Sequence, residues 1–300
     1  MSALHSKRRS KRISGYAAGA VLFTIVMAAV TAPLWVPHSP TYIDPTQRLL
    51  PPSGQHLFGT DHFGRDIFSR VIYGAQISLG VGFIVTLLSI VLGTITGLLA
   101  GYFPKADSFL MRIIDGIMAF PSVLLAIAMV AALGGNMFNL VTALVIAFWP
   151  NMTRVVRSST LLIVNMQYVE AAKAIGTKHT AIMIRHILPN SLTPIIVQAT
   201  FIFAKAILAE ASLSFLGLGI KPPTPTWGSM LGESQVYLTT APWFSVLPGI
   251  AILLTVLSLN VFGDLFREMV NPHLSRRRGG FLFKRMSIKP AGKLEENGGG

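Results

Sequence analysis

The sequence contains no cysteine and little charge. Without cysteine among its 300 residues, the chain can form neither a disulfide framework nor a thiolate metal centre. Only 12% of the residues are charged, whereas about a quarter is usual in soluble domains. The hydrophobic share is 52% and the mean hydropathy is +0.59. This composition predicts an integral membrane protein.

Six apolar segments are long enough to cross a hydrocarbon core, which takes about 20 helical residues. We therefore predict an all-α membrane protein with six transmembrane helices, at 15–36, 78–102, 110–133, 138–160, 192–219 and 244–265. Pro121 and Pro150 predict kinks in the third and fourth segments. Gly93, Gly97 and Gly101 recur every four residues, which allows close approach of a neighbouring helix.

The net charge of +13 is explained by membrane topology. If the N-terminus is cytoplasmic, most Lys and Arg residues fall in inside segments, as the positive-inside rule requires. The basic charge then gives no reason to expect nucleic-acid binding, and both termini are predicted to be cytoplasmic. The outside segments hold four basic residues balanced by four acidic ones: Arg48, Arg65, Arg70, Lys221, Asp44, Asp61, Asp66 and Glu233.

The first apolar segment could be a signal peptide or a retained span. Its apolar run is longer than usual for a signal, and Pro33 follows the plausible cleavage site at Ala32, which favours a retained span. The expected organisation is a basic cytoplasmic tail (1–14), a first span with an outside segment (15–77), a transmembrane domain (78–267) and a disordered basic tail (268–300). Residues 65–78 are expected to form an interfacial helix leading into the second span.

A polar, helix-prone block lies between the fourth and fifth spans, within 168–190. It reads Glu170-Ala171-Ala172-Lys173-Ala174-Ile175-Gly176, and nine residues later His186-Ile187-Leu188-Pro189-Asn190. Gly176 predicts two short helices meeting at a glycine. The expected common face holds Ala171, Ala174, Ile175, Ile182 and His186. From physics alone, a docking surface for another protein and a helix lying on the bilayer are equally supported.

The spacing Glu-Ala-Ala, three residues, Gly resembles the EAA loop of bacterial ABC-importer permeases. The ending His186-x-Leu188-Pro189-Asn190 is similar to the dipeptide/oligopeptide/nickel branch of that family. Three further blocks agree: Gly59-Thr60-Asp61 with Gly64-Arg65-Asp66, Leu213–Gly219, and Pro223–Gly228 with its Trp227. The resemblance runs from about residue 15 to 275.

This resemblance implies a type I (MetI-like) permease fold and a second permease subunit of the DppC/OppC type. It implies a heterodimer with a homologous permease, two cytoplasmic ATP-binding subunits, and a periplasmic or lipid-anchored solute-binding protein. The expected cargo is a peptide or related small solute, and the expected location is the bacterial inner membrane. ATPase coupling would fall to Glu170, Ala171, Ala172, Gly176, His186, Leu188, Pro189 and Asn190. No catalytic residue, cofactor or metal is expected, and the chain has no Gly-x-x-x-x-Gly-Lys-Ser/Thr loop for ATP.

Charges within spans are costly and usually face the bundle interior. Lys205, Glu210 and Phe215 are candidates for the translocation path or gate. A structural role for Lys205 and Glu210, each pairing with a neighbouring helix, is favoured about two to one. Asp115 is expected to pair with Arg154 or Arg157.

Four residues are candidates for the periplasmic face. Arg65 and Asp66 could seal the outer mouth, meet the binding protein, or form a local salt bridge at the headgroups. Asp61 precedes them, and Trp227 is suited to the membrane interface. The seven histidines show no metal-ligand spacing.

Two rival classes remain. A stand-alone transporter driven by an ion gradient would need inverted repeats and midplane carboxylates in both halves, but only Glu210 lies deep. A membrane-embedded enzyme would need paired catalytic groups, and none can be placed at one depth.

Overall fold

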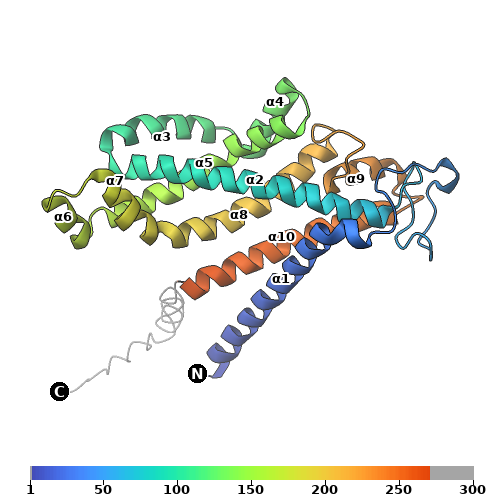
Figure 1. The fold of residues 1–300 in the computed structure, drawn as a ribbon, viewed down its shortest axis with the longest axis horizontal. Helices are drawn as coiled ribbons and strands as arrows, with labels where there is room; N and C mark the ends of the chain where they lie inside the picture. The colour runs from blue at the N-terminus through green and yellow to red at the C-terminus, as the bar shows by residue number, and fades with distance from the viewer. Residues whose placement is uncertain (1, 271–300) are drawn as a thin grey trace, which may run out of the picture.

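The computed structural model describes residues 2–270, with side chains placed from Ile13 to Met269. Over this range the regular secondary structure is helical, apart from one isolated bridge between Thr60 and Asp66, and irregular loops connect the helices. The expectation of disorder in the C-terminal tail concerns residues outside this range, beyond position 270. The α-helices, shown in Figure 1, are α1 (Ser2–Trp35), α2 (Ile67–Tyr102), α3 (Pro104–Met118), α4 (Ser122–Leu133), α5 (Met137–Ile163), α6 (Gln167–Ala174), α7 (His179–Ile182), α8 (Leu188–Phe215), α9 (Trp227–Ser234) and α10 (Trp243–Val270).

Five helical segments are long and apolar enough to cross a membrane, and six if the bent pair α3–α4 counts as one span. The all-helical membrane class is therefore confirmed. Two predicted elements need correction. The interfacial helix at 65–78 and the second span are one continuous helix, α2, which begins at Ile67. The third span is broken rather than kinked: α3 and α4 meet at 81°, because Pro121 lacks the N–H that would continue the helix.

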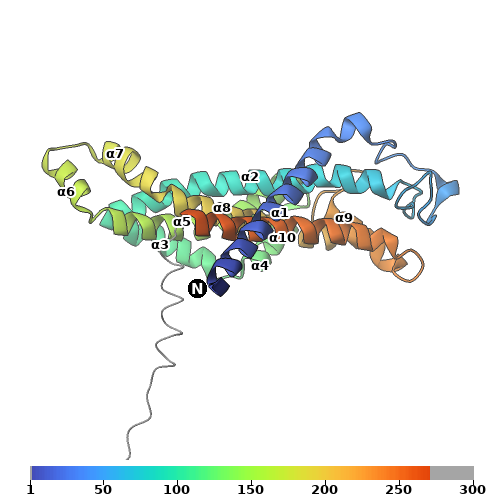
Figure 2. The same cartoon turned by 90° about the horizontal axis from the view of Figure 1, so that it is seen from below.

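The core lies among α2, α5 and α8, which run side by side in Figures 1 and 2. The glycine stripe of α2 works as predicted. Cβ atoms added to Gly93, Gly97 and Gly101 would lie 2.5–2.6 Å from Met152, Val156 and Thr160 of α5. The backbones therefore meet where only glycine fits. Helix α5 continues through Pro150 to Ile163.

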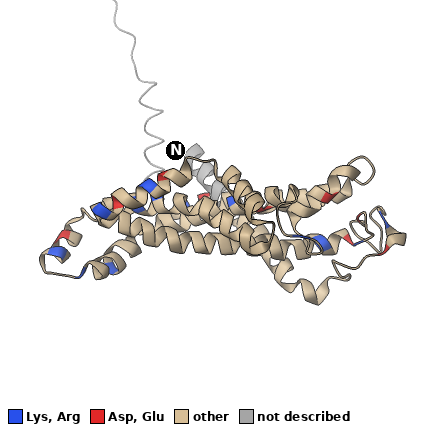
Figure 3. Cartoon of the chain, turned by 90° about the horizontal axis from the view of Figure 1, so that it is seen from above, with Lys and Arg blue, Asp and Glu red and all other residues tan. Residues whose placement is uncertain are grey.

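Helix α1 lies mainly along α10, to one side of this core (Figure 1). The contact again uses small residues: Gly15 faces Leu265 and Gly19 faces Phe262. In Figure 3 the charged residues gather toward the two ends of the helical body. One end carries the loop of residues 36–66 and α9, and the other carries α6 and α7 (Figure 2). After the orientation predicted from the charge distribution, residues 36–66 are called the outer loop and residues 168–190 the inner loop. These two ends hold the candidate sites.

Candidate functional site

The inner end carries the predicted Glu-Ala-Ala block as two short helices. Helix α6 ends at Ala174 and is followed by Gly176, whose φ is +79°. The Gly176 amide donates to the Lys173 carbonyl and the Thr177 amide to the Ala172 carbonyl, each at 3.0 Å. This pair of hydrogen bonds is a Schellman cap, which requires a residue that tolerates the left-handed conformation. The prediction of two helices meeting at this glycine is confirmed.

The second half of the block leads directly into α8. Met183–Ile187 forms a π-helical turn, and Pro189 lies in the first turn of α8. A π turn widens the helix. Here it ends at Ile187, shortly before Pro189, which has no N–H to donate to the carbonyl of Arg185. Asn190 Nδ2 donates to the His186 carbonyl at 2.7 Å. The loop is therefore an ordered extension of a membrane-spanning helix.

The residues predicted to share one face of the loop divide between exposed and buried positions. Val169, Ala172, Ile182, Met183 and Ile187 are buried, whereas Ala171, Ala174 and Ile175 are exposed, with Ile175 at 83%. Ala171, Ala174 and Ile175 therefore lie together on an exposed face, as predicted, but Ile182 does not share it, because the turn at Gly176 resets the helical phase between α6 and α7. Of the residues predicted to couple to the ATPase, His186 and Leu188 are half-buried. Those that are exposed are Glu170, Ala171, Gly176, Pro189 and Asn190.

The opposite end of the molecule holds a buried cluster of four charges. Asp61 Oδ2 accepts from Arg65 Nε at 2.6 Å and from Arg70 Nη1 at 2.5 Å. Glu233 Oε2 accepts from Arg65 Nη2 at 2.7 Å and from Arg70 Nη2 at 3.0 Å. The two arginines thus bridge the two carboxylates. Since Glu233 belongs to α9 and Arg70 to α2, the cluster joins the outer loop, α2 and α9.

Two turns of the outer loop place its charged side chains in the interior of the protein. Gly59 and Gly64 have φ values of +72° and +76° and form the turns expected at these glycines. Asp66 caps α2 by accepting from the Ser69 amide at 2.7 Å. Asp61, Arg65 and Asp66 are all buried. They therefore hold the outer loop in place and present almost no surface to a partner.

Burial changes the titration of two groups beside this cluster. It raises the pKa of the Glu233 carboxyl above its ordinary value, although Arg65 and His62 act in the opposite direction. It lowers the pKa of the His62 imidazole, although the nearby Asp61 and Glu233 carboxylates favour its charged form. The His62 ring stacks on Tyr237 at 5.5 Å.

Trp227 is buried rather than at the membrane interface. It is 1% exposed, and its indole Nε1 donates to the Val71 carbonyl of α2 at 2.9 Å. Beside it, Glu210 of α8 is fully buried and accepts from Ser78 Oγ at 2.9 Å and Ser214 Oγ at 2.7 Å. Glu210 therefore links α8 to α2, the structural role that was favoured over lining an open path.

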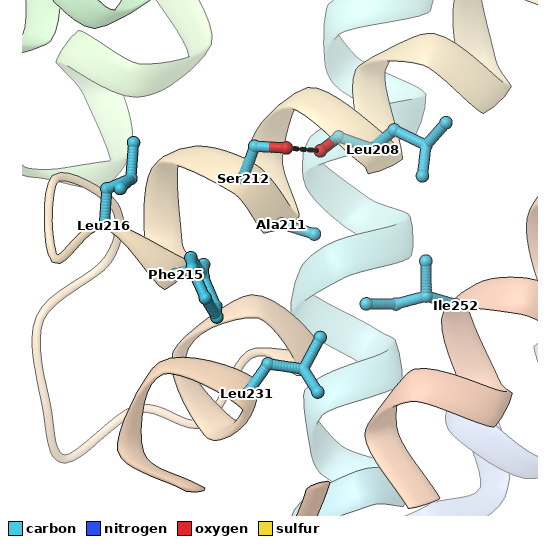
Figure 4. Close-up of a pocket in the computed structure, with 7 residues that line it drawn as sticks. All are labelled: Leu208, Ala211, Ser212, Phe215, Leu216, Leu231 and Ile252. Carbon is cyan, nitrogen blue, oxygen red and sulfur yellow. Dashed lines mark hydrogen bonds between the residues drawn. The ribbon is translucent and has the colours of Figure 1, made fainter. Parts of the chain in front are cut away.

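Lys205 lies on a different face of α8 and is exposed, as are Leu208, Ser212 and Phe215. Leu208, Ser212 and Phe215 border an open apolar cavity of about 350 Å³ between α8, α9 and α10, as Figure 4 shows. The expected pairing of Lys205 with a neighbouring helix does not occur among the described residues. Nearer the inner end of α5, Arg154 Nη2 donates to Asp115 at 2.6 Å as predicted, while Arg157 pairs with Asp107.

Two groups of side chains have the composition of metal ligands: His38, His56 and Asp66, and Asp61, His62 and Glu233. The histidine spacing in the sequence did not reveal them. In the first group, His56 Nδ1 already contacts Asp66 at 2.9 Å and Nε2 contacts Gln47 at 2.6 Å. In the second, the carboxylates of Asp61 and Glu233 already pair with Arg65 and Arg70. The absence of a metal site stays a prediction.

Sequence reasoning missed two contacts between distant segments. The sequence analysis counted Arg70 and Glu233 among the outside charges but did not predict that they pair, because no local pattern connects them. Tyr102 and His179 were not singled out, yet Tyr102 Oη lies 2.8 Å from His179 Nδ1. Both contacts involve an end of α2.

Comparisons with known proteins agree with this architecture. Residues 89–276 match the family described as binding-protein-dependent transport system inner membrane component. The chain is 45% identical over 255 residues to the dipeptide transport system permease protein DppC of Alkalihalophilus pseudofirmus, covering 85% of this chain and 84% of the relative. It is 42% identical over 260 residues to the glutathione transport system permease protein GsiD of Pectobacterium atrosepticum, covering 86% of each.

A solved structure has the same fold. A chain of the inward-facing MetNI methionine ABC transporter matches with a TM-score of 0.56 and 18% identity, covering 67% of this chain and 96% of that one. The family match, on a fold shared with that transporter chain, defines a transport permease. The chain belongs to the family of inner-membrane components of binding-protein-dependent transport systems. It is the non-catalytic, multi-pass permease component of an ABC importer, which works with ATPase subunits and a binding protein.

Proposed function

We propose that this permease moves peptides or a closely related solute such as glutathione into the cell. Relatives at 42–45% identity are named for dipeptide, di/tripeptide and glutathione transport. The inward direction needs α6 and α7 on the cytoplasmic side, and the positive-inside pattern of the chain supports that orientation. Both termini are then cytoplasmic.

The loop from Glu170 to Asn190 is the proposed docking surface for the ATPase. The observation that carries this proposal is an ordered loop whose short helices pack on the membrane helices with one face and are exposed on the other. Ala172 and Ile182 are buried against the membrane helices, while Glu170 and Gly176 are exposed and nothing lies within 4 Å of the Gly176 Cβ position. An exposed carboxylate beside small residues suits an arginine of a partner approaching closely.

A pair of glycine variants tests the docking surface. Gly176→Arg places bulk and charge on it, so we expect ATPase subunits no longer to co-purify and solute uptake to fall at least tenfold. Gly176→Ala carries the same backbone strain, since φ is +79°, without the bulk, and should retain the ATPase. Glu170→Arg should resemble Gly176→Arg. Normal co-purification of the ATPase with both arginine variants would contradict the proposal.

A second surface, on α8, is the proposed contact with the second permease and the translocation path. Lys205, Leu208, Ser212 and Phe215 follow one another at intervals of three and four residues, and all four are exposed. This is the spacing of one helix face that meets another helix. A lysine within a span costs about 2.5–3.5 kcal/mol on insertion scales, so this face is better suited to protein or water than to lipid.

Crosslinking tests the α8 surface directly, because the chain has no cysteine. Ser212→Cys, labelled in membranes with the photoactivatable reagent benzophenone-4-maleimide and irradiated, is expected to crosslink to a second permease subunit identified by mass spectrometry. Leu253→Cys on α10, 61% exposed, is the matched control and should remain uncrosslinked. The opposite result would place the contact on α10 and overturn the assignment.

A further inference from the structure

Helix α2 connects the two candidate sites as one unbroken element. It runs without interruption from Ile67 to Tyr102, 36 residues, which corresponds to about 54 Å at 1.5 Å per residue. Its first turns contact the outer loop and α9, and its last residue contacts the inner loop. In Figure 1, α2 extends from the outer loop toward α7.

The inner end of α2 is fastened to the loop by an aromatic cluster. Tyr102 Oη lies 2.8 Å from His179 Nδ1, the first residue of α7. The Tyr102 and Phe103 rings meet the His179 ring edge-on, at 5.5 and 5.8 Å. Lys173 Nζ of α6 lies 5.6 Å from the centre of the Tyr102 ring. Both short helices of the loop therefore touch the last turn of α2.

The outer end of α2 holds both ends of α9. Near the start of α9, the Val71 carbonyl accepts from the Trp227 indole at 2.9 Å. At its end, Arg70 Nη2 donates to Glu233 at 3.0 Å. About one turn further along α2, Gly74 is packed against Trp227. These contacts join α2 directly to α9, which also packs on α8 and α10.

We propose that α2 transmits the movement of the ATPase-docking loop to α9, and that Tyr102 is the positioning residue that connects loop and helix through His179. The proposal rests on the docking role assigned above to residues 170–190. When the loop is displaced, the Tyr102–His179 contact pulls the inner end of α2. Because α2 has no proline and no break, it moves as one body, and α9 follows at the outer mouth.

The test follows α9 optically during the ATPase cycle. Val236, 82% exposed and just after α9, is changed to cysteine and labelled with bimane. The reporter is used in the complete importer, whose other subunits are Cys-less, reconstituted in liposomes. We expect ATP with vanadate to change bimane fluorescence in the otherwise unmodified chain. Tyr102→Phe removes only the hydroxyl, and should reduce that change at least threefold while the ATPase rate stays within twofold.

Two controls separate transmission from a general loss of structure. Tyr73→Phe removes a hydroxyl from the same helix, one that makes no hydrogen bond to another described residue, and should leave the signal unchanged. His179→Phe should act like Tyr102→Phe, and the double variant should be no worse than either single one, because both remove the same contact. An unreduced signal in Tyr102→Phe, or no ATP-dependent signal in the reference importer, would overturn the proposal.

The outcome is distinguishable from failure of the docking surface. If the loop does not dock the ATPase, Gly176→Arg retains the ATPase subunits, whatever Tyr102→Phe does. If the loop docks but α2 is not the transmitting element, Gly176→Arg loses the ATPase and Tyr102→Phe keeps the full fluorescence change. The two proposals are therefore tested by different variants.

Discussion

Arg70, in the first turn of α2, donates to Glu233 of α9 across 163 residues of sequence, at 3.0 Å. The Arg70 side chain is 1% exposed and that of Glu233 is 19% exposed. The same guanidinium also contacts Asp61 at 2.5 Å. This contact is the point at which the outer loop, α2 and α9 are held together, and it makes the outer end of the molecule sensitive to a single substitution.

Removal of the Glu233 carboxylate should destabilise the protein strongly. Glu233→Ala leaves two buried guanidinium groups with one carboxylate, and breaking a buried pair costs about 3–5 kcal/mol. We expect a loss of about 3 kcal/mol, at the lower end because Glu233 keeps some solvent contact. Tryptophan fluorescence during thermal unfolding in detergent measures it. Glu170→Ala, exposed at the inner loop, should change stability by less than about 0.5 kcal/mol. Equal effects of the two variants would contradict the role of the cluster.

Acidification should weaken the outer end through His62. Burial lowers the pKa of this imidazole below 6.5 in the folded protein, so the unfolded chain binds the proton more readily. Stability contributed by neutral His62 is therefore complete above pH 6.5 and is lost as the pH falls through the lowered pKa. His62→Phe keeps the stacking on Tyr237 and should flatten this part of the curve of unfolding temperature against pH. Superimposable curves for the two proteins would refute it.

The glycine stripe gives a prediction with a control on the same helix. In Gly97→Ala the new Cβ would lie 2.6 Å from Val156 Cβ, so α2 and α5 must separate. Overpacking of this kind costs about 1–3 kcal/mol. In Gly80→Ala nothing lies within 4 Å, so stability should stay the same or rise by up to about 1 kcal/mol. Chemical unfolding in detergent compares the two, and a neutral Gly97→Ala would show that the helices are not in close contact.

Single cysteines can establish the orientation of the chain. Ile175→Cys is predicted to react with a membrane-impermeant maleimide only in inside-out vesicles, because α6 is proposed to be cytoplasmic. Val236→Cys should react only in right-side-out vesicles. Both positions are more than 80% exposed, so accessibility to the reagent and not burial decides the result. The reverse pattern would invert the topology.

Features that depend on local helical geometry were predictable from the sequence. The four-residue spacing of Gly93, Gly97 and Gly101 encodes the α2–α5 contact, and Gly176 encodes the turn between α6 and α7. The Asp115–Arg154 pair was also predicted. Both of its side chains are about half exposed, and such pairs contribute only about 0–1 kcal/mol to stability. These predictions needed no knowledge of which segments meet.

Features that depend on tertiary contacts were not predictable. Trp227 carries a polar N–H, which suits the membrane interface as well as the Val71 carbonyl. The choice between the two is made by the position of α9 against α2. The common face of the inner loop was mispredicted at Ile182, beyond Gly176, for a related reason. Helical phase is not carried through a glycine with positive φ.

The broken pair α3–α4 has a consequence for the surrounding lipid. The 15 residues of α3 and the 12 of α4 measure about 22 and 18 Å, and the hydrocarbon core is about 30 Å thick. Neither piece reaches across alone, and at the 81° bend backbone carbonyls lose their helical partners. Hydrocarbon cannot satisfy such groups. The bilayer beside this subunit must therefore thin, or give way to protein or water, at the depth of Pro121.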